Sequence, residues 1–128
     1  MKLGKSLIKA DIIAAHQAIE YFEQNGVKDI KNVAAYHLQQ AAEKLLKYQI
    51  YKSLDNVNNH SMYTHDLSRL IDYADSEDLQ LVVPEYIRSH VNSISDWEAG
   101  SRYDIGFSIR IDTLKKTYEE IEQWEQQV

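Results

Sequence analysis

Glycine and proline are rare in this chain, and their scarcity constrains the fold more than any other feature. The 128 residues contain four glycines and one proline. A protein built from many strands needs such residues at its turns, so a mostly helical fold is expected. The apolar residues agree with this expectation, because they recur every three or four positions over long stretches.

Two long helices are predicted in the first half of the chain. The first covers about residues 6–25 and ends at Asn25-Gly26, which favours a left-handed stop. Its predicted apolar face consists of Leu7, Ala14, Ala15, Ala18 and Phe22. The second covers about residues 30–53 and carries a continuous stripe of Ala34, Leu38, Ala41, Ala42, Leu45 and Leu46. Small alanines in this stripe allow a neighbouring helix to approach closely.

A loop and a short helix are predicted next. Residues 55–63 contain several Asn and Asp side chains that compete with helical hydrogen bonds. Thr64 is the predicted N-cap of a short helix that ends near Tyr73, with Asp66 in its first turn.

Two further long helices complete the prediction. Pro84 fits the first turn of a helix that buries Ile87, Val91, Ile94 and Trp97 and stops at Gly100. Residues 101–108 are then a linker, and a last helix covers about residues 109–126, burying Ile111, Leu114, Tyr118 and Ile121. Short connections favour an all-α, up-and-down four-helix bundle with one additional short helix, in a single domain over residues 1–128.

Charge and composition exclude several classes of protein. A formal net charge of −6 argues against binding of extended DNA or long RNA, which depends on lysine and arginine. The absence of cysteine excludes disulfides, thiolate metal sites and a cysteine nucleophile. No apolar run approaches 18 residues, so we expect no membrane association and a cytoplasmic location.

The second helix also carries a set of polar residues at helical spacing, roughly opposite its apolar stripe. They are Tyr36, Gln40, Glu43 and Lys47, flanked by His37 and Lys44. One interpretation is a solvated face with weak helical ion pairs. The other is a half-buried polar seam against another helix, a second subunit or a ligand.

The dipeptide Arg102-Tyr103 is a second candidate for a binding role. Arg102 could pair with Glu43 or with a phosphate through two parallel hydrogen bonds. Alternatively, it is an ordinary arginine that binds the last carbonyls of its helix.

His65 is a third candidate, because the N-terminus of a helix attracts anions. In the structural alternative, His65 is only a residue of the first helical turn and has no binding role. Two further residues are interpreted as structural: His90 as a satisfied core histidine, and Asp11 as a carboxylate that needs a partner if it is buried.

Familiar catalytic and metal-binding patterns are absent from the sequence. There is no Glu-x-x-His, His-Glu-x-x-His, Gly-x-Ser-x-Gly or Gly-x-Gly-x-x-Gly. We therefore predict no metal site and no catalytic residues.

Three segments together resemble the HEPN domain family, named for its nucleotide-binding members in higher eukaryotes and prokaryotes. They are YHLQQAAEKLLK at 36–47, THDL at 64–67 and RY at 102–103. The resemblance spans nearly the whole chain. It implies a helical bundle, a homodimer, an association with a minimal nucleotidyltransferase, and nucleotide binding.

Many HEPN relatives are instead ribonucleases of toxin and antiphage systems, which use an arginine followed after four to six residues by a histidine. This chain departs from that pattern, because no arginine has a histidine at that spacing. The missing imidazole removes the group expected to move protons during RNA cleavage.

The resemblance favours a non-catalytic nucleotide-binding module, with a bound nucleotide of unknown identity and no other cofactor. The alternatives are a protein-binding scaffold or antitoxin-like bundle without nucleotide binding, and a ribonuclease with a degenerate active site. In the favoured hypothesis Glu43 orients Arg102, Lys44 and Lys47 present charge to a phosphate or acidic partner, and Tyr36 and Tyr103 stack on a base. The site residues for nucleotide or partner binding are Tyr36, Gln40, Glu43, Lys44, Lys47, His65, Arg102 and Tyr103.

Overall fold

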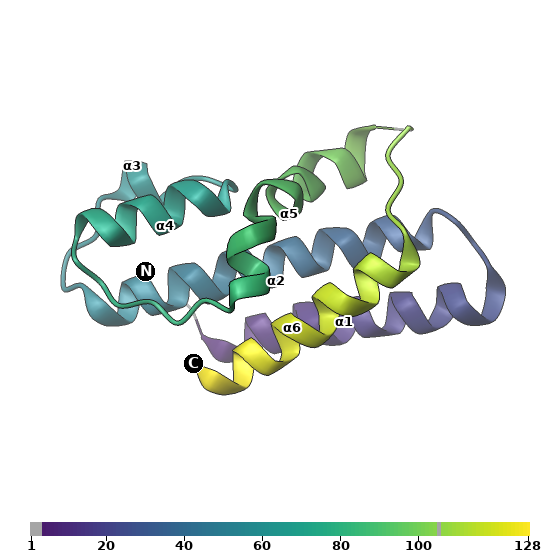
Figure 1. The fold of residues 1–128 in the computed structure, drawn as a ribbon, viewed down its shortest axis with the longest axis horizontal. Helices are drawn as coiled ribbons and strands as arrows, with labels where there is room; N and C mark the ends of the chain where they lie inside the picture. Colours follow the sequence, from purple (N-terminus) through teal and green to yellow (C-terminus); the bar gives the residue numbers. More distant parts are fainter. Residues whose placement is uncertain (1–3, 105) are drawn as a thin grey trace.

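The computed structural model describes residues 4–104 and 106–128, and these residues form helices and connections without any strand. The helices are α1 (Lys5–Asn25), α2 (Ile30–Ser53), α3 (Asn59–Met62), α4 (Leu67–Ser76), α5 (Glu85–Tyr103) and α6 (Ile111–Gln127). The four long helices alternate in direction along the chain, with α5 inclined to the others (Figure 1). The predicted all-α bundle is therefore confirmed.

Helix α2 is the central element of the bundle. It packs against α1, α4, α5 and α6, so both its apolar stripe and much of its polar face lie inside the protein. The stripe predicted from the sequence is fully buried along its length. Because α2 is surrounded, its polar side chains must find partners within the fold.

Helix α1 begins and ends close to the predicted residues, but its buried face was predicted only in part. Gly26 adopts φ 68° at the C-cap, as the Asn25-Gly26 pair suggested. Ala15 and Ala18 are buried, whereas Leu7 is 53% exposed. The prediction that Leu7 belongs to the buried face is wrong, because the face turned to α2 and α6 follows the isoleucines instead. Its buried residues are Ile8, Asp11, Ile12, Ala15, Ala18 and Ile19.

The region between α2 and α5 differs from the prediction in its caps. A single helical turn, α3, lies within the predicted loop. Helix α4 begins at Leu67, and its N-cap is Asp66, whose carboxylate accepts a hydrogen bond from the Ser68 amide. The predicted N-cap, Thr64, instead accepts a hydrogen bond from the Asp66 amide. Hydrogen bonds from Ser68 lower the pKa of Asp66, which keeps the cap ionised.

Helix α5 continues to Tyr103, so the predicted stop at Gly100 is wrong. Gly100 instead leaves room for a neighbouring side chain, because a Cβ built on it would lie 2.7 Å from the ring of Phe107. The chain after α5 folds back over this position, and α6 begins at Ile111, two residues later than predicted. As a result Arg102 and Tyr103 are held on a helix and do not lie in a linker.

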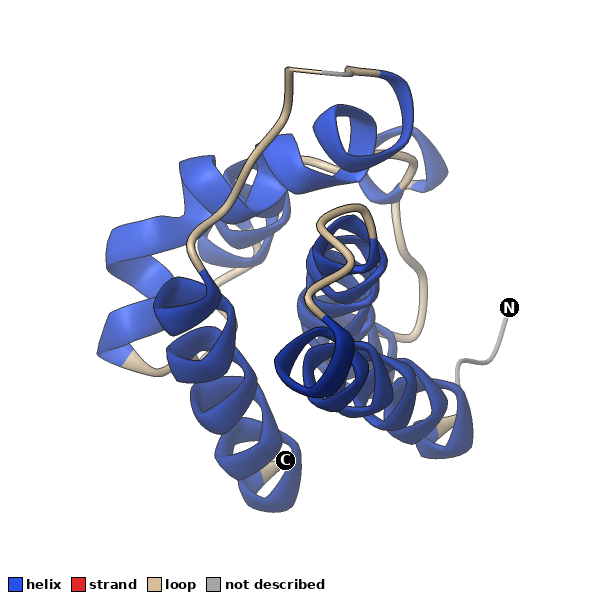
Figure 2. Cartoon of the chain, turned by 90° about the vertical axis from the view of Figure 1, so that its right-hand side faces the viewer, coloured by secondary structure: helices blue, strands red, loops and turns tan. Residues whose placement is uncertain are grey.

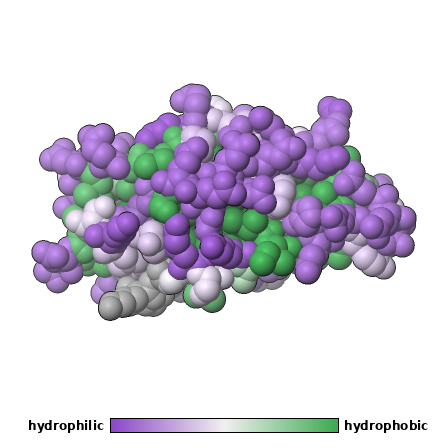
Figure 3. Space-filling model, turned by 90° about the horizontal axis from the view of Figure 1, so that it is seen from below, coloured by the Kyte–Doolittle hydropathy of each residue, from purple (hydrophilic) through white to green (hydrophobic). Residues whose placement is uncertain are grey.

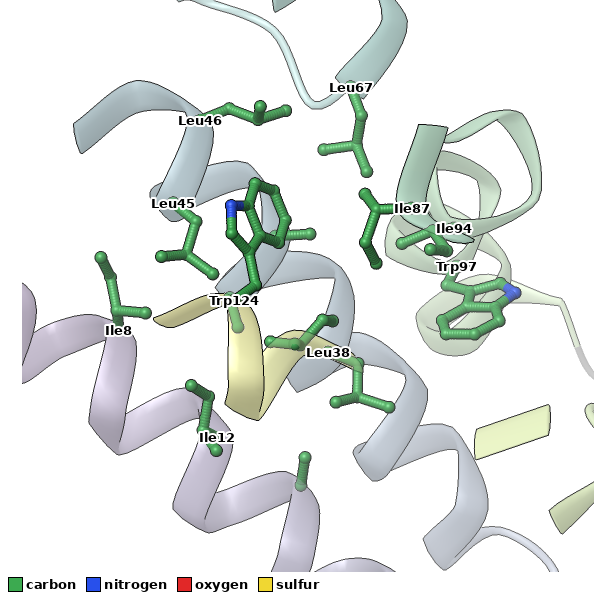
Figure 4. Packing of buried hydrophobic residues seen from close by; sticks show 14 of the residues in the cluster. Ile8, Ile12, Leu38, Leu45, Leu46, Leu67, Ile87, Ile94, Trp97 and Trp124 are labelled. Carbon is green, nitrogen blue, oxygen red and sulfur yellow. The ribbon is translucent and has the colours of Figure 1, made fainter. Parts of the chain in front are cut away.

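The connection between α4 and α5 is fixed to the core by two buried side chains. Gln49 of α2 accepts from the Val82 amide at 2.7 Å and donates to the Val82 carbonyl at 3.0 Å. The same carbonyl accepts from the indole N–H of Trp124. Trp124 is fully buried, and Figure 4 shows it beside Leu45 of α2 and facing Ile8 of α1. The backbone N–H and C=O of Val82, which lie outside the helices, are thus hydrogen-bonded to side chains.

The α1–α2 and α5–α6 connections lie at the same end of the molecule (Figures 1 and 2). This arrangement brings the beginning of α2 close to the end of α5, where two of the three motif segments meet. Within the described part of the chain, no helix combines the length and the apolarity needed to cross a membrane.

Candidate functional site

Glu43 is the centre of a polar seam inside the bundle. Glu43 is only 5% exposed. It accepts hydrogen bonds from Gln39 at 3.1 Å, from His65 Nδ1 at 2.8 Å and from Lys47 at 2.9 Å. Gln39 also donates to the carbonyl of His65 at 3.0 Å and accepts from Gln40 at 2.7 Å. The polar face of α2 is therefore a half-buried seam, and the interpretation as a solvated face is wrong.

Arg102 binds a different carboxylate from the one predicted. Its guanidinium donates to the side chain of Glu98, one turn earlier in α5, and its Nε donates to the Glu98 carbonyl at 3.3 Å. The prediction of a direct Glu43–Arg102 pair is thus wrong. Glu98 precedes Arg102 by four residues on the same helix, and this spacing brings the two side chains together. The carbonyl contact agrees with the structural alternative for Arg102.

His65 links these two carboxylates. Its Nδ1 contacts Glu43, while its Nε2 lies 3.8 Å from a Glu98 oxygen. The ionic chain therefore runs Lys47–Glu43–His65–Glu98–Arg102 and joins α2, the start of α4 and α5. The ring of His65 is 59% exposed, so solvent or a ligand can reach the middle of the ionic chain.

The guanidinium of Arg102 also lies against two aromatic rings. Its centre is 5.3 Å from the ring of Tyr36 and 4.8 Å from the ring of Tyr103. Such distances are typical of cation–π contacts. Tyr103 is 73% exposed, so one of its faces is open to solvent. We call Tyr36, Arg102 and Tyr103 the stacking corner.

The two lysines predicted to present charge outward are instead paired within the protein. Lys47 binds Glu43, and Lys44 binds Asp11 of α1 at 2.5 Å. Asp11 also accepts from His37 at 2.8 Å, so the partner expected for a buried Asp11 is confirmed. Burial alone would raise the pKa of Asp11, but the hydrogen bonds from His37 and Lys44 outweigh it and lower the pKa.

Three hollows share lining residues at this end of the bundle, and residues of the stacking corner line two of them. One of about 350 Å³ is lined by Tyr36, His37 and Arg102, and one of about 300 Å³ by Arg102, Tyr103 and Asp104. The third, of about 220 Å³, is lined by Lys28, Lys31 and Phe107 among others. All three share Asp29 and Asn32. Because they share these two lining residues, we call the three hollows together the end groove.

Several residues of the site escaped the sequence analysis. Glu98 could have been found, because it precedes Arg102 by four residues on a helix. Gln39 lies beside the apolar stripe, and its position alone did not distinguish it from a core residue. Asp29 and Asn32 enter the site only because the two connections meet at one end of the bundle, which no local pattern indicates.

Comparison with known families decides the identity of the fold. The family model described as HEPN domain matches residues 13–127. The chain belongs to the HEPN domain family. No match was found among the curated proteins or among the solved structures.

The HEPN match includes the stacking corner, the ionic chain and the end groove, since all of their residues lie between 13 and 127. The cluster offers ring faces, a guanidinium and paired carboxylates. Within residues 4–104 and 106–128, no group of three or more histidine, aspartate or glutamate side chains is arranged to hold a metal ion.

Proposed function

We propose that this HEPN domain is a non-catalytic nucleotide-binding module whose base-binding surface is the stacking corner. The observation that carries the proposal is the closeness of the Arg102 guanidinium to the rings of both Tyr36 and Tyr103, at the wall of an open hollow. Aromatic and guanidinium faces are the surfaces on which proteins stack nucleobases.

Arg102 is suited to this role because its charge and geometry are already fixed. Glu98 holds the guanidinium by its Nε and by one terminal nitrogen. An arginine has five N–H donors, so donors remain for the edge of a base. Little side-chain entropy is then lost on binding, which favours affinity.

Calorimetric titration with AMP and GMP tests the proposal. Tyr103→Ala removes an exposed ring that contacts Arg102, and we expect affinity to fall about tenfold, because a base stack contributes about 1–3 kcal/mol. Tyr63→Ala is the matched control, since Tyr63 is 92% exposed and lies elsewhere. Arg102→Lys, which keeps the charge and loses the planar group, should weaken binding as well.

Absence of binding heat in the folded wild-type protein would reject the nucleotide role. It would favour the scaffold or antitoxin-like alternative, in which the seam only stabilises the fold. Equal losses in the Tyr103→Ala and Tyr63→Ala variants would place the site elsewhere.

A degenerate ribonuclease is the second candidate, and one observation favours it. His65 and Arg102 approach the same carboxylate, Glu98, although His65 lies in the connection before α4 and Arg102 lies on α5. An imidazole and a guanidinium therefore lie close together without the usual sequence spacing. Incubation of the protein with total RNA, beside His65→Ala and Arg102→Ala variants, tests this candidate. Cleavage that both variants abolish would replace the non-catalytic proposal.

The proposal includes two partners: a second copy of the chain and a minimal nucleotidyltransferase. Membership of the HEPN family supports both. Exposed apolar side chains on α1, namely Leu7, Ile13 and Tyr21, support the second copy. Coexpression with a nucleotidyltransferase followed by gel filtration tests the second partner, and separate elution of the two chains would count against it.

A further inference from the structure

The three hollows of the end groove share two lining residues, Asp29 and Asn32. Residues of the stacking corner line two of the hollows. Lys28, Lys31 and Phe107 line the third, and Lys31 belongs to the first turn of α2. A ligand that reaches from the stacking corner to the two lysines therefore passes Asp29 and Asn32.

We propose that the end groove binds a nucleoside monophosphate in one orientation. The base lies on the stacking corner, the ribose at Asp29 and Asn32, and the phosphate at Lys28 and Lys31. This inference rests on the proposed function, because it assumes that the stacking corner holds the base. It adds the residues that select the sugar and the number of phosphates.

The middle of the groove is suited to a ribose. Asp29 occupies the N-cap position of α2, where an aspartate usually accepts a hydrogen bond from the helix. Here its side chain makes no such bond, and the carboxylate is left to line the hollows. A carboxylate accepts from sugar hydroxyls, and the amide of Asn32 can both donate and accept.

The lysine end of the groove is suited to a phosphate. Unlike Lys44 and Lys47, neither Lys28 nor Lys31 forms an ion pair with a carboxylate among the described residues. The ammonium of Lys31 lies 5.0 Å from the centre of the Phe22 ring, and Lys31 also lines this hollow. Ser108 adds a hydroxyl to the same hollow.

Charge favours one phosphate group. A phosphate monoester carries about −1.5 to −2 at neutral pH, which two lysines can balance. A triphosphate would bring more negative charge than they can match, and the groove also contains Asp29 and Asp104. The charge of Arg102 is already balanced by Glu98. We therefore expect monophosphates to bind more tightly than triphosphates.

Titrations with adenosine, AMP and ATP test the orientation. For the wild type we expect AMP to bind about tenfold more tightly than adenosine, as charge-assisted hydrogen bonds allow, and ATP to bind more weakly than AMP. In the double variant Lys28→Gln, Lys31→Gln the affinity for AMP should fall to that of adenosine. The affinity for adenosine itself should not change. Lys52→Gln, at the opposite end of α2, is the matched control.

A second comparison tests the ribose contact. Asp29→Asn should reduce the preference of the protein for AMP over 2′-deoxy-AMP, because the carboxylate is the stronger acceptor for the 2′-hydroxyl. Equal wild-type affinities for adenosine and AMP would overturn the inference while leaving the base-binding proposal intact. Absence of binding for all three probes would reject the proposed function and the inference together.

Discussion

At the scale of single residues, the polar side chains of α2 act mainly within the fold. Glu43 accepts hydrogen bonds from three side chains, two on α2 and one, His65, in the connection before α4. A buried ion pair does not guarantee net stabilisation, but the loss of one partner leaves the others unpaired. The carboxylate therefore fixes the position of His65 and Lys47.

Replacement of Glu43 by alanine should destabilise the protein by about 2–4 kcal/mol, because Gln39 and Lys47 would lose their acceptor in a half-buried setting. Chemical denaturation of the purified variant measures this change. Glu119→Ala is the control, since Glu119 is exposed on α6 and should change stability by about 0.5 kcal/mol or less. Similar stabilities for the two variants would show that the seam contributes nothing to folding.

The contacts of Asp11 predict how the free energy of unfolding depends on pH, and in which direction. Its pKa in the folded protein is lowered, with burial opposed by the hydrogen bonds from His37 and Lys44. A lowered folded pKa means that the stabilisation is fully present above the unfolded value, about 3.9, and is lost as the pH falls through the folded value. The free energy of unfolding lost in Asp11→Asn should therefore be present at pH 5 and shrink below about pH 4.

Denaturant unfolding of wild type and Asp11→Asn over this pH range provides the measurement. The quantity of interest is the difference between the two proteins at each pH, which cancels the titration of unrelated groups. A difference that does not change between pH 7 and pH 3 would contradict the assigned contacts.

At the scale of secondary structure elements, the close approach of Phe107 to Gly100 fixes the α5–α6 connection. Gly100→Ala would gain helix propensity of up to about 1 kcal/mol, but the new methyl group would overlap the Phe107 ring. We expect a net destabilisation of about 1–2 kcal/mol, typical of overpacking. Thermal or chemical denaturation measures the effect.

Removal of the Phe107 ring should abolish or reverse the destabilisation expected for Gly100→Ala. In a Phe107→Ala background, Gly100→Ala should be neutral or stabilising, and the double-mutant cycle then gives the coupling between the two positions. If Gly100→Ala stabilises the protein with Phe107 present, the ring does not lie where the structure has it.

The elements were largely predictable from the sequence, because each long helix buries a stripe of apolar residues with helical spacing. Their ends were less predictable. Gly100 resembled a stop but packs beneath Phe107, and Thr64 resembled a cap although Asp66 provides it. The partner of Arg102 was missed for a different reason. Glu98 precedes Arg102 by four residues on the same helix, a local spacing that the prediction of a Glu43–Arg102 pair passed over.

At the scale of the whole molecule, the exposed apolar side chains of α1 predict self-association. Leu7, Ile13 and Tyr21 are each at least 50% exposed, and apolar side chains reach the surface between polar ones on the lower face shown in Figure 3. We expect light scattering to give twice the monomer mass of 14.9 kDa. Ile13→Glu should shift the protein to the monomer, because a charge in an interface is costly.

Val82→Glu is the matched control for this prediction, since Val82 is exposed to a similar extent but lies on the connection before α5. It should leave the mass unchanged. A monomeric wild-type protein would remove the second copy from the proposal without affecting the stacking corner.

The most direct test of the account is an NMR titration of the full chain with AMP, followed through the backbone amides. The account predicts that the largest shifts fall around the end groove, at Asn32, Tyr36, Arg102 and Gly106, and that Tyr103→Ala reduces them. Shifts that are absent, or that cluster instead between α5 and α6 around His90 and Trp97, would contradict the assignment of the stacking corner as the nucleotide site.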